Sequence, residues 1–253
     1  MACAPIRLVG RSYLRLMAIV CLSLAVLALA LIIREGGWTE PGSRRAGALL
    51  LSAGFVPIAA WIFLNAAQGD AIRASQRALA LIGGAGWLGA ALALARSGDT
   101  LIGQGAAGGA PATFTSAITT CLGAGLLGSA TAAMLLGHRY LTDTGMSIAP
   151  LRRLAKIYVA IVIVRSIWVL GASLPIWGAG FEPQGGYVWF WLMICVRLGI
   201  GVVGVGIFAW MVRDCVKRRS TQSATALFYL SMIFIFLGEL SGQYLLRSEA
   251  LAM

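Results

Sequence analysis

Three ionisable residues lie inside long apolar stretches of this chain: Arg165 in IVIVRSIWVL, Arg197 in MICVRLGIG and Glu239 in FLGEL. A charged side chain deep in a bilayer is unfavourable by at least a few kcal/mol, so such residues are expected to face the interior of a helix bundle and to pair. We therefore predict that all three face inward and that at least one arginine contacts Glu239 directly or through water.

The two arginines outnumber the one carboxylate, and an arginine stays charged in a protein. The surplus positive charge of Arg165, Arg197 and Glu239 invites an anionic or strongly polarised ligand, such as a lipid phosphate, a haem propionate or a reduced quinone oxygen. The alternative is a structural ion pair, bonded to backbone carbonyls or to a partner helix.

Two neighbouring side chains extend this cluster. Gln243 follows Glu239 by four residues on the same helix face and offers both a donor and an acceptor, and Trp168 follows Arg165 by three. Together with Arg197 they predict a polar pocket with an aromatic wall, open toward the outer leaflet, of the kind that a quinone headgroup needs. Interfacial anchoring or hydrogen bonding between helices is the alternative role for each.

His138, in GHRYLTDTG after the fourth apolar stretch, is the only histidine. It is a candidate proton relay together with Glu239, with a plain interfacial role as the alternative. One histidine cannot supply both ligands of a bis-histidine haem, and the five cysteines form no C-x-x-C pair, so we expect no metal cofactor held by this chain alone. Nothing resembles a nucleophile with its base or a two-carboxylate metal site, so we expect no catalytic residues of a stand-alone hydrolase.

The elements that position these residues are membrane helices. Hydrophobic residues make up 59% of the 253 and charged residues 11%, and the mean hydropathy is +0.86, whereas soluble domains have about 25% charged residues. Stretches of about 20 apolar residues predict transmembrane helices. We predict an all-α integral membrane protein, a single polytopic domain over 1–253 with about seven spans: 13–33, 46–67, 76–96, 114–137, 154–177, 188–212 and 222–246.

The first span resembles a signal peptide because Arg7, Arg11 and Arg15 precede an apolar run. Its uncharged core from Leu16 to Ile33 is longer than the usual apolar region of a signal peptide, which favours a retained helix.

Glycines recur within the fourth and sixth predicted spans. Gly199, Gly201, Gly204 and Gly206 mimic a dinucleotide-binding fingerprint, but no strand and turn precede them. Small residues let helices approach closely in membranes. We therefore predict close helix packing at these positions and around Gly123 in span four.

The net charge of +11 indicates topology rather than nucleic-acid binding, because basic residues gather in cytoplasmic loops. Thirteen of the 20 Lys and Arg residues lie in the N-terminal segment and in loops two, four and six, and five lie in the alternate segments. The thirteen are Arg7, Arg11, Arg15, Arg73, Arg77, Arg139, Arg152, Arg153, Lys156, Arg213, Lys217, Arg218 and Arg219. This bias predicts a multi-pass protein of a bacterial-type inner membrane, with its N-terminus in the cytoplasm and its C-terminus outside.

The segment FIFLGELSGQYLL resembles the last helix of the membrane anchor subunits of dimethyl-sulfoxide-reductase-type molybdoenzymes, through Gly238, Glu239, Leu240 and Gly242. The resemblance covers about a dozen residues. Such anchors are bundles of about eight spans that oxidise quinol and pass electrons to an iron–sulfur partner, so the resemblance implies a quinone-linked role. The chain differs from that family in its span count and in having Gln243 where an arginine is expected.

The leading interpretation is an integral membrane subunit of a respiratory-type redox complex that binds quinone or lipid and anchors electron-transfer partner subunits. The expected partners are the lipid bilayer and hetero-oligomeric redox subunits. A carrier of small anionic solutes and a purely structural subunit of a larger assembly are the alternatives.

Overall fold

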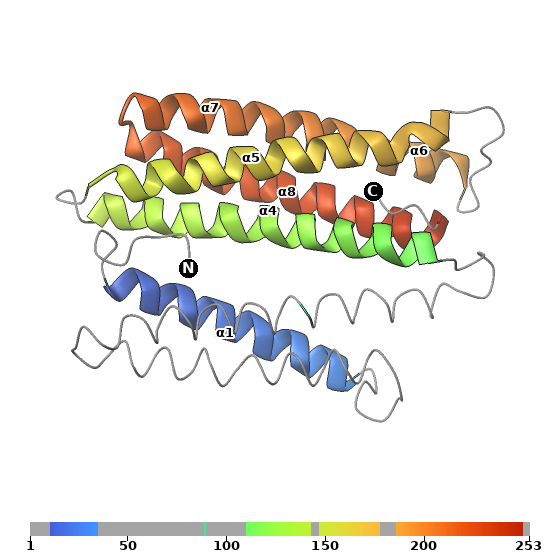
Figure 1. Ribbon diagram of the computed structural model, residues 1–253, viewed down its shortest axis with the longest axis horizontal. Coiled ribbons are helices and arrows are strands. Elements are labelled where there is room, and N and C mark those ends of the chain that lie inside the picture. Colours follow the sequence, from blue (N-terminus) through green and yellow to red (C-terminus); the bar gives the residue numbers. More distant parts are fainter. Residues whose placement is uncertain (1–10, 35–88, 90–109, 143–146, 178–185, 250–253) are drawn as a thin grey trace. The chain divides into compact units, whose positions relative to one another are not determined.

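The structure is a computed structural model, and its described residues are 11–34, 89, 110–142, 147–177 and 186–249. The chain divides into two compact units, Met1–Leu101 and Ile102–Met253, and each is described by itself. All secondary structure in the described residues is helical (Figure 1).

In the first unit, helix α1 spans Arg11–Arg34 and covers the predicted span 13–33. Among the residues of α1 that the structure describes, the apolar helical stretch is Leu16–Leu27. The predicted spans 46–67 and 76–96 lie outside the described residues, Gly89 excepted.

The second unit contains four helical stretches that are long and apolar enough to cross a membrane: Ile118–Leu141, Ala149–Ser173, Tyr187–Lys217 and Thr221–Leu246. They confirm four of the predicted spans, those at 114–137, 154–177, 188–212 and 222–246. The protein is therefore a multi-pass helical membrane protein. Apolar side chains that remain accessible on these helices, such as Ile167, Trp210 and Leu240, suit contact with lipid.

The four stretches correspond to the following helices. The first belongs to α4 (Ala110–Thr142), the second to α5 (Ala149–Ser173), and the last to α8 (Thr221–Glu249). The third is made of α6 (Tyr187–Cys195), the π-helical segment η2 (Val196–Gly204) and α7 (Val205–Lys217). α5 begins with Pro150 in its first turn and passes into the 3₁₀ turn η1 (Leu174–Trp177), which contains Pro175. Proline suits the first turn of a helix but lacks the N–H that an interior turn needs.

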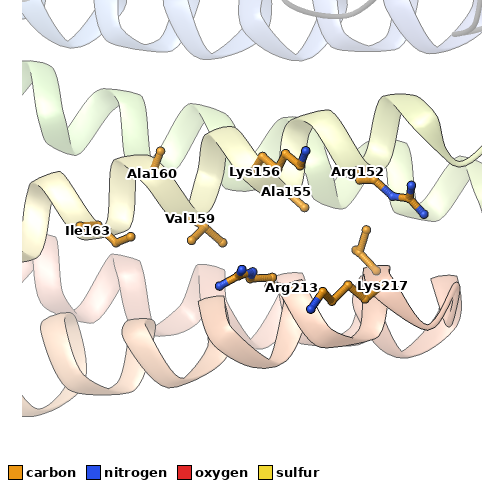
Figure 2. Close-up of a pocket in the computed structure, with 9 residues that line it drawn as sticks. Arg152, Ala155, Lys156, Val159, Ala160, Ile163, Arg213 and Lys217 are labelled. Carbon is orange, nitrogen blue, oxygen red and sulfur yellow. The ribbon is translucent and has the colours of Figure 1, made fainter.

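The four stretches form a bundle in which each packs against two neighbours. α8 lies against α4, η2 and α7, and α5 lies against α4 and α7. At one end, basic side chains of α5 and α7 flank the space between those two helices (Figure 2). Buried between α5 and α8, the Tyr158 hydroxyl hydrogen-bonds Ser231, and its ring meets Phe228 edge-on with centroids 5.5 Å apart.

α4 continues beyond the predicted end at residue 137, so His138 and Tyr140 lie in its last turns and not in a loop. The reason is tertiary packing. Tyr140 is buried, and its hydroxyl donates a hydrogen bond to the carbonyl of Ser147, so the helix continues until this contact is made.

The segment η2 interrupts the third stretch with nine residues of π-helix. At its end, the backbone N–H of Val205 donates to the carbonyl of Ile200, five residues back. η2 and α8 approach each other at two glycines, since a Cβ on Gly201 would lie 2.9 Å from the Cα of Gly238, and a Cβ on Gly238 would lie 2.6 Å from the Cα of Gly201. The predicted close packing is confirmed at this crossing.

Gly201→Ala should destabilise the protein, because the added methyl group meets backbone that cannot rotate away. We expect a loss of about 1–3 kcal/mol, typical of an overpacked interior, measured as a lower midpoint of thermal unfolding in detergent. Gly199→Ala is the matched control, since it lies two residues away in η2 and a Cβ there meets nothing within 4 Å. Equal midpoints for the two variants would contradict the close approach.

Candidate functional site: a buried arginine–glutamate triad

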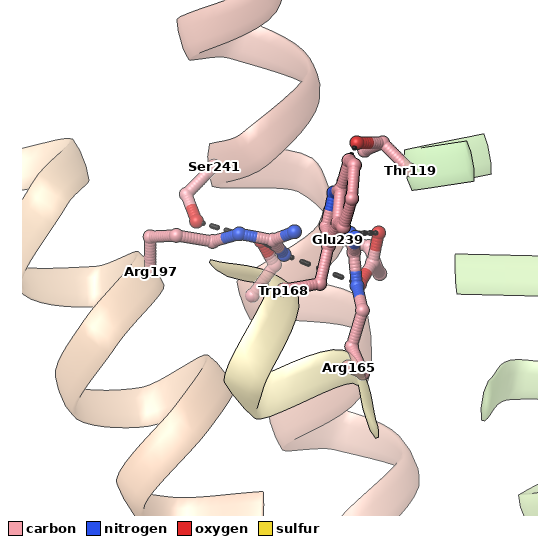
Figure 3. Close-up of polar contacts among 7 residues, drawn as sticks. Thr119, Arg165, Trp168, Arg197, Glu239 and Ser241 are labelled. Atoms are coloured by element: carbon pink, nitrogen blue, oxygen red, sulfur yellow. Dashed lines mark hydrogen bonds and ion pairs between the residues drawn. The ribbon is translucent and has the colours of Figure 1, made fainter. Parts of the chain in front are cut away.

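Arg165, Arg197 and Glu239 converge inside the bundle from α5, η2 and α8, and we call them the triad (Figure 3). Arg165 forms a forked pair with the carboxylate: its Nη2 lies 2.9 Å from Oε2 and 3.1 Å from Oε1, and its Nε lies 3.2 Å from Oε1. Nη1 of Arg197 donates to Oε1 across 3.2 Å. The prediction that the three face inward and touch is confirmed.

Arg197 is also bonded to backbone. Its Nη1 donates to the carbonyl of Gly238 across 2.5 Å, and the Ser241 hydroxyl donates to the same carbonyl across 2.8 Å. Both arginine side chains are almost wholly buried, at 4% exposure for Arg165 and 2% for Arg197, whereas 22% of the Glu239 side chain stays accessible. Glu239 is therefore the most accessible member of the triad.

Two glycines make room for these charges. A Cβ on Gly123 in α4 would lie 2.7 Å from Oε2 of Glu239, and a Cβ on Gly242 in α8 would lie 2.8 Å from Cζ of Arg197. At these positions the missing side chain leaves space for a charged group and not only for a neighbouring helix. A signal in the sequence was the four-residue spacing of Gly238 and Gly242, which puts two small residues on one helix face.

Trp168 lies beside the triad and joins α5 to α4. Its indole Nε1 donates to the hydroxyl of Thr119 across 2.9 Å (Figure 3). Thr119 is buried and was not among the predicted site residues. The aromatic wall of the predicted pocket is thus next to the charges, and its polar atom is bonded to the neighbouring helix.

Gln243 lies outside this arrangement. Its side chain is exposed and lines a separate open hollow of about 610 Å³ on α8, with Leu240, Tyr244 and Ser248. Four residues of α-helix turn through about 40° beyond one full turn. Glu239 lies at the edge of the buried face of α8, which holds Ser241 and Gly242, so this further rotation carries Gln243 to the exposed side.

His138 does not reach Glu239. It is exposed in the last turns of α4, fifteen residues beyond Gly123, which faces the carboxylate. Fifteen residues of helix rise about 22 Å. Any proton path between the two residues needs intermediate groups.

The described residues contain no group of three or more His, Cys, Asp or Glu side chains that could hold a metal ion. The chemistry that the triad offers is electrostatic and acid–base: two permanent cations, one carboxylate and a carbonyl-bonded guanidinium. One member of the triad, Arg197, belongs to the π-helical segment η2. Such segments occur often at functional sites.

Comparison of the chain with protein families, with curated proteins and with solved structures found no significant match.

Glu239→Gln should destabilise the protein by about 3 kcal/mol, because removing one partner of a buried ion pair leaves charge uncompensated. Thermal or denaturant unfolding in detergent measures the effect. Arg218→Gln is the control: Arg218 pairs with Asp214 at 2.8 Å, but their side chains are 76% and 46% exposed, so the loss should stay below about 1 kcal/mol. A loss no larger in Glu239→Gln than in the control would show that the triad contributes little to stability.

Proposed function

We propose that this protein is an integral membrane subunit of a redox complex and that the triad borders the site of a quinone headgroup. The observation that supports this proposal most is the accessible part of Glu239: a carboxylate held by two arginines between spanning helices, with 22% of its side chain still open. A carboxylate fully enclosed by its partners would have no route to exchange a proton with a ligand.

The chemistry of the triad suits a quinone. Oxidation of a quinol releases two electrons and two protons, and a carboxylate within hydrogen-bonding distance can accept one of these protons. Guanidinium groups can stabilise the negative charge that develops on a quinone oxygen. Trp168, bonded to Thr119, supplies a fixed aromatic surface beside the charges. The electrons would pass to a partner subunit, as the resemblance of FIFLGELSGQYLL implies.

A structural subunit is the second candidate, and a specific observation favours it. Gly123 and Gly242 leave room that the Glu239 and Arg197 side chains occupy, and the triad bonds three separate helical segments. Neither the hollow beside Gln243 nor the space between α5 and α7 is lined by a member of the triad. In this role the triad would fix the helix arrangement without binding a ligand.

The proposed topology has seven spans, with the N-terminus in the cytoplasm and the C-terminus outside, in a bacterial-type inner membrane. Basic residues support it by clustering at one end of the bundle, where α4 and α7 end and α5 and α8 begin. At the opposite end, Trp191 of α6 packs against Trp177 and Tyr187, with ring centroids 5.9 and 6.1 Å apart. Aromatic belts of this kind form at membrane interfaces. The basic residues are Arg139, Arg152, Arg153, Lys156, Arg213, Lys217, Arg218 and Arg219.

Reporter fusions test this topology. Fusion of alkaline phosphatase, which is active only outside the cytoplasm, after Met253 should give an active enzyme, and fusion of a fluorescent protein that folds only in the cytoplasm should give no signal there. The same two reporters fused after Arg218 should give the opposite result, because that loop is predicted to be cytoplasmic. Alkaline phosphatase should be inactive there, and the fluorescent protein should give a signal. A cytoplasmic signal after Met253 would reject the orientation or the seven-span count.

Glu239→Gln and Arg197→Met test the quinone proposal in membranes that contain the assembled complex. We expect each to lower quinone-dependent electron transfer at least tenfold, because the first removes the proton acceptor and the second a cation beside the ligand. Arg218→Gln, which removes one positive charge as Arg197→Met does but at an exposed site, should leave the rate unchanged. Unchanged turnover in both assembled triad variants would reject the quinone site and favour the structural role.

A further inference from the structure

A second candidate site begins at the basic end of the bundle, between α5 and α7 (Figure 2). It is a groove of about 570 Å³, within the range of roughly 300–1,000 Å³ for small-molecule sites. On α5, Arg152 at the basic end of the groove and Arg165 in the triad are thirteen residues apart, which is about 20 Å of helix, whereas Ile163 at the other end of the groove is two residues from Arg165.

Four cations line the groove, two from each helix: Arg152 and Lys156 of α5, and Arg213 and Lys217 of α7. In each helix the pair is four residues apart, so both members share one face. No acidic side chain lines the groove, and none of the four cations makes an ion pair with another described residue. The groove therefore concentrates positive charge without internal compensation.

The other wall residues are all apolar: Ala155, Val159, Ala160, Ile163 and Val216. From Arg152 to Ile163 the wall of α5 runs for about 16 Å along the helix axis. It continues from the basic end into the part of α5 that is long and apolar enough to cross a membrane. The groove thus has a cationic end and an apolar end, aligned with the helices.

We propose that this groove binds an anionic phospholipid, with its phosphate among the four cations and an acyl chain along the apolar wall. Basic pockets between membrane helices bind anionic headgroups, and guanidinium groups suit phosphate oxygens. A soluble anion would satisfy the cations but leave the apolar wall unfilled, and an acidic peptide would place polar backbone against it. A lipid satisfies both ends. No member of the triad lines the groove, and this proposal does not depend on the quinone proposal.

Native mass spectrometry of the detergent-purified full chain tests the proposal. Phosphatidylglycerol should bind at least tenfold more tightly than phosphatidylcholine with the same acyl chains. Lys156→Gln/Arg213→Gln should reduce that preference at least fivefold, whereas Lys156→Arg/Arg213→Lys, which keeps the charge, should retain it. Equal affinity for the two lipids in the unmodified protein would overturn the proposal.

A charge-matched control separates the groove from a general attraction between a basic protein and an anionic lipid. Arg153→Gln/Arg219→Asn removes two charges at the same end of the bundle but outside the groove, and asparagine tolerates the positive φ of 59° at residue 219. This control should keep the preference within twofold. An equal loss in the control and in Lys156→Gln/Arg213→Gln would reject a specific site.

Glycerol 3-phosphate distinguishes a lipid from a soluble phosphate. It carries the anionic group without acyl chains, so it should fail to displace phosphatidylglycerol at a hundredfold molar excess. Displacement by glycerol 3-phosphate would show that the apolar wall contributes nothing and would overturn the assignment to a lipid. Every variant should have an unfolding midpoint within about 2 °C of that of the unmodified protein. Val159→Gln, which leaves the cations intact, gives an independent readout. It should lower the affinity for long-chain but not for short-chain phosphatidylglycerol.

Discussion

The pairing of two arginines with one carboxylate between membrane helices constrains the rest of the second unit. Arg165 and Arg197 are buried in segments that cross an apolar environment, so each must keep its partner. Satisfying both at Glu239 requires α5, η2 and α8 to meet at one level of the bundle. Gly123, Gly238 and Gly242 allow that meeting, because larger side chains there would occupy the space of the charged groups or of the neighbouring backbone.

The two ends of the bundle differ in chemistry. One end carries many cations and a groove that combines charge with an apolar wall, and the other carries an aromatic cluster around Trp191. The triad lies inside the bundle and is held by hydrogen bonds among its own side chains and by the bond of Arg197 to the carbonyl of Gly238. Ligand binding at the groove would act on α5 and α7, and ligand binding at the triad would act on α5, η2 and α8.

Sequence reasoning succeeded where one strong physical requirement acts alone. Length and hydropathy predicted the four spans of the second unit, and the high cost of isolated charge in lipid predicted that Arg165, Arg197 and Glu239 meet. It failed where packing decides among similar local options. Gln243 is exposed because it lies about 40° around α8 from Glu239. The end of α4 depends on a contact of Tyr140 with Ser147. Nothing in the sequence indicates that Thr119 bonds Trp168.

The position of Arg197 in the triad depends on the hydrogen-bond pattern of the π-helical segment η2. In η2 the hydrogen bonds reach five residues back, so each turn holds more residues than a turn of α-helix, and the helix before the segment is rotated relative to the helix after it. Arg197 is the second residue of η2. A change of this segment to α-helical hydrogen bonding would turn Arg197 around the helix axis relative to α7, away from the carbonyl of Gly238 and the carboxylate of Glu239. The ion pair of Arg197 with Glu239 therefore depends on the backbone hydrogen-bond pattern of this span.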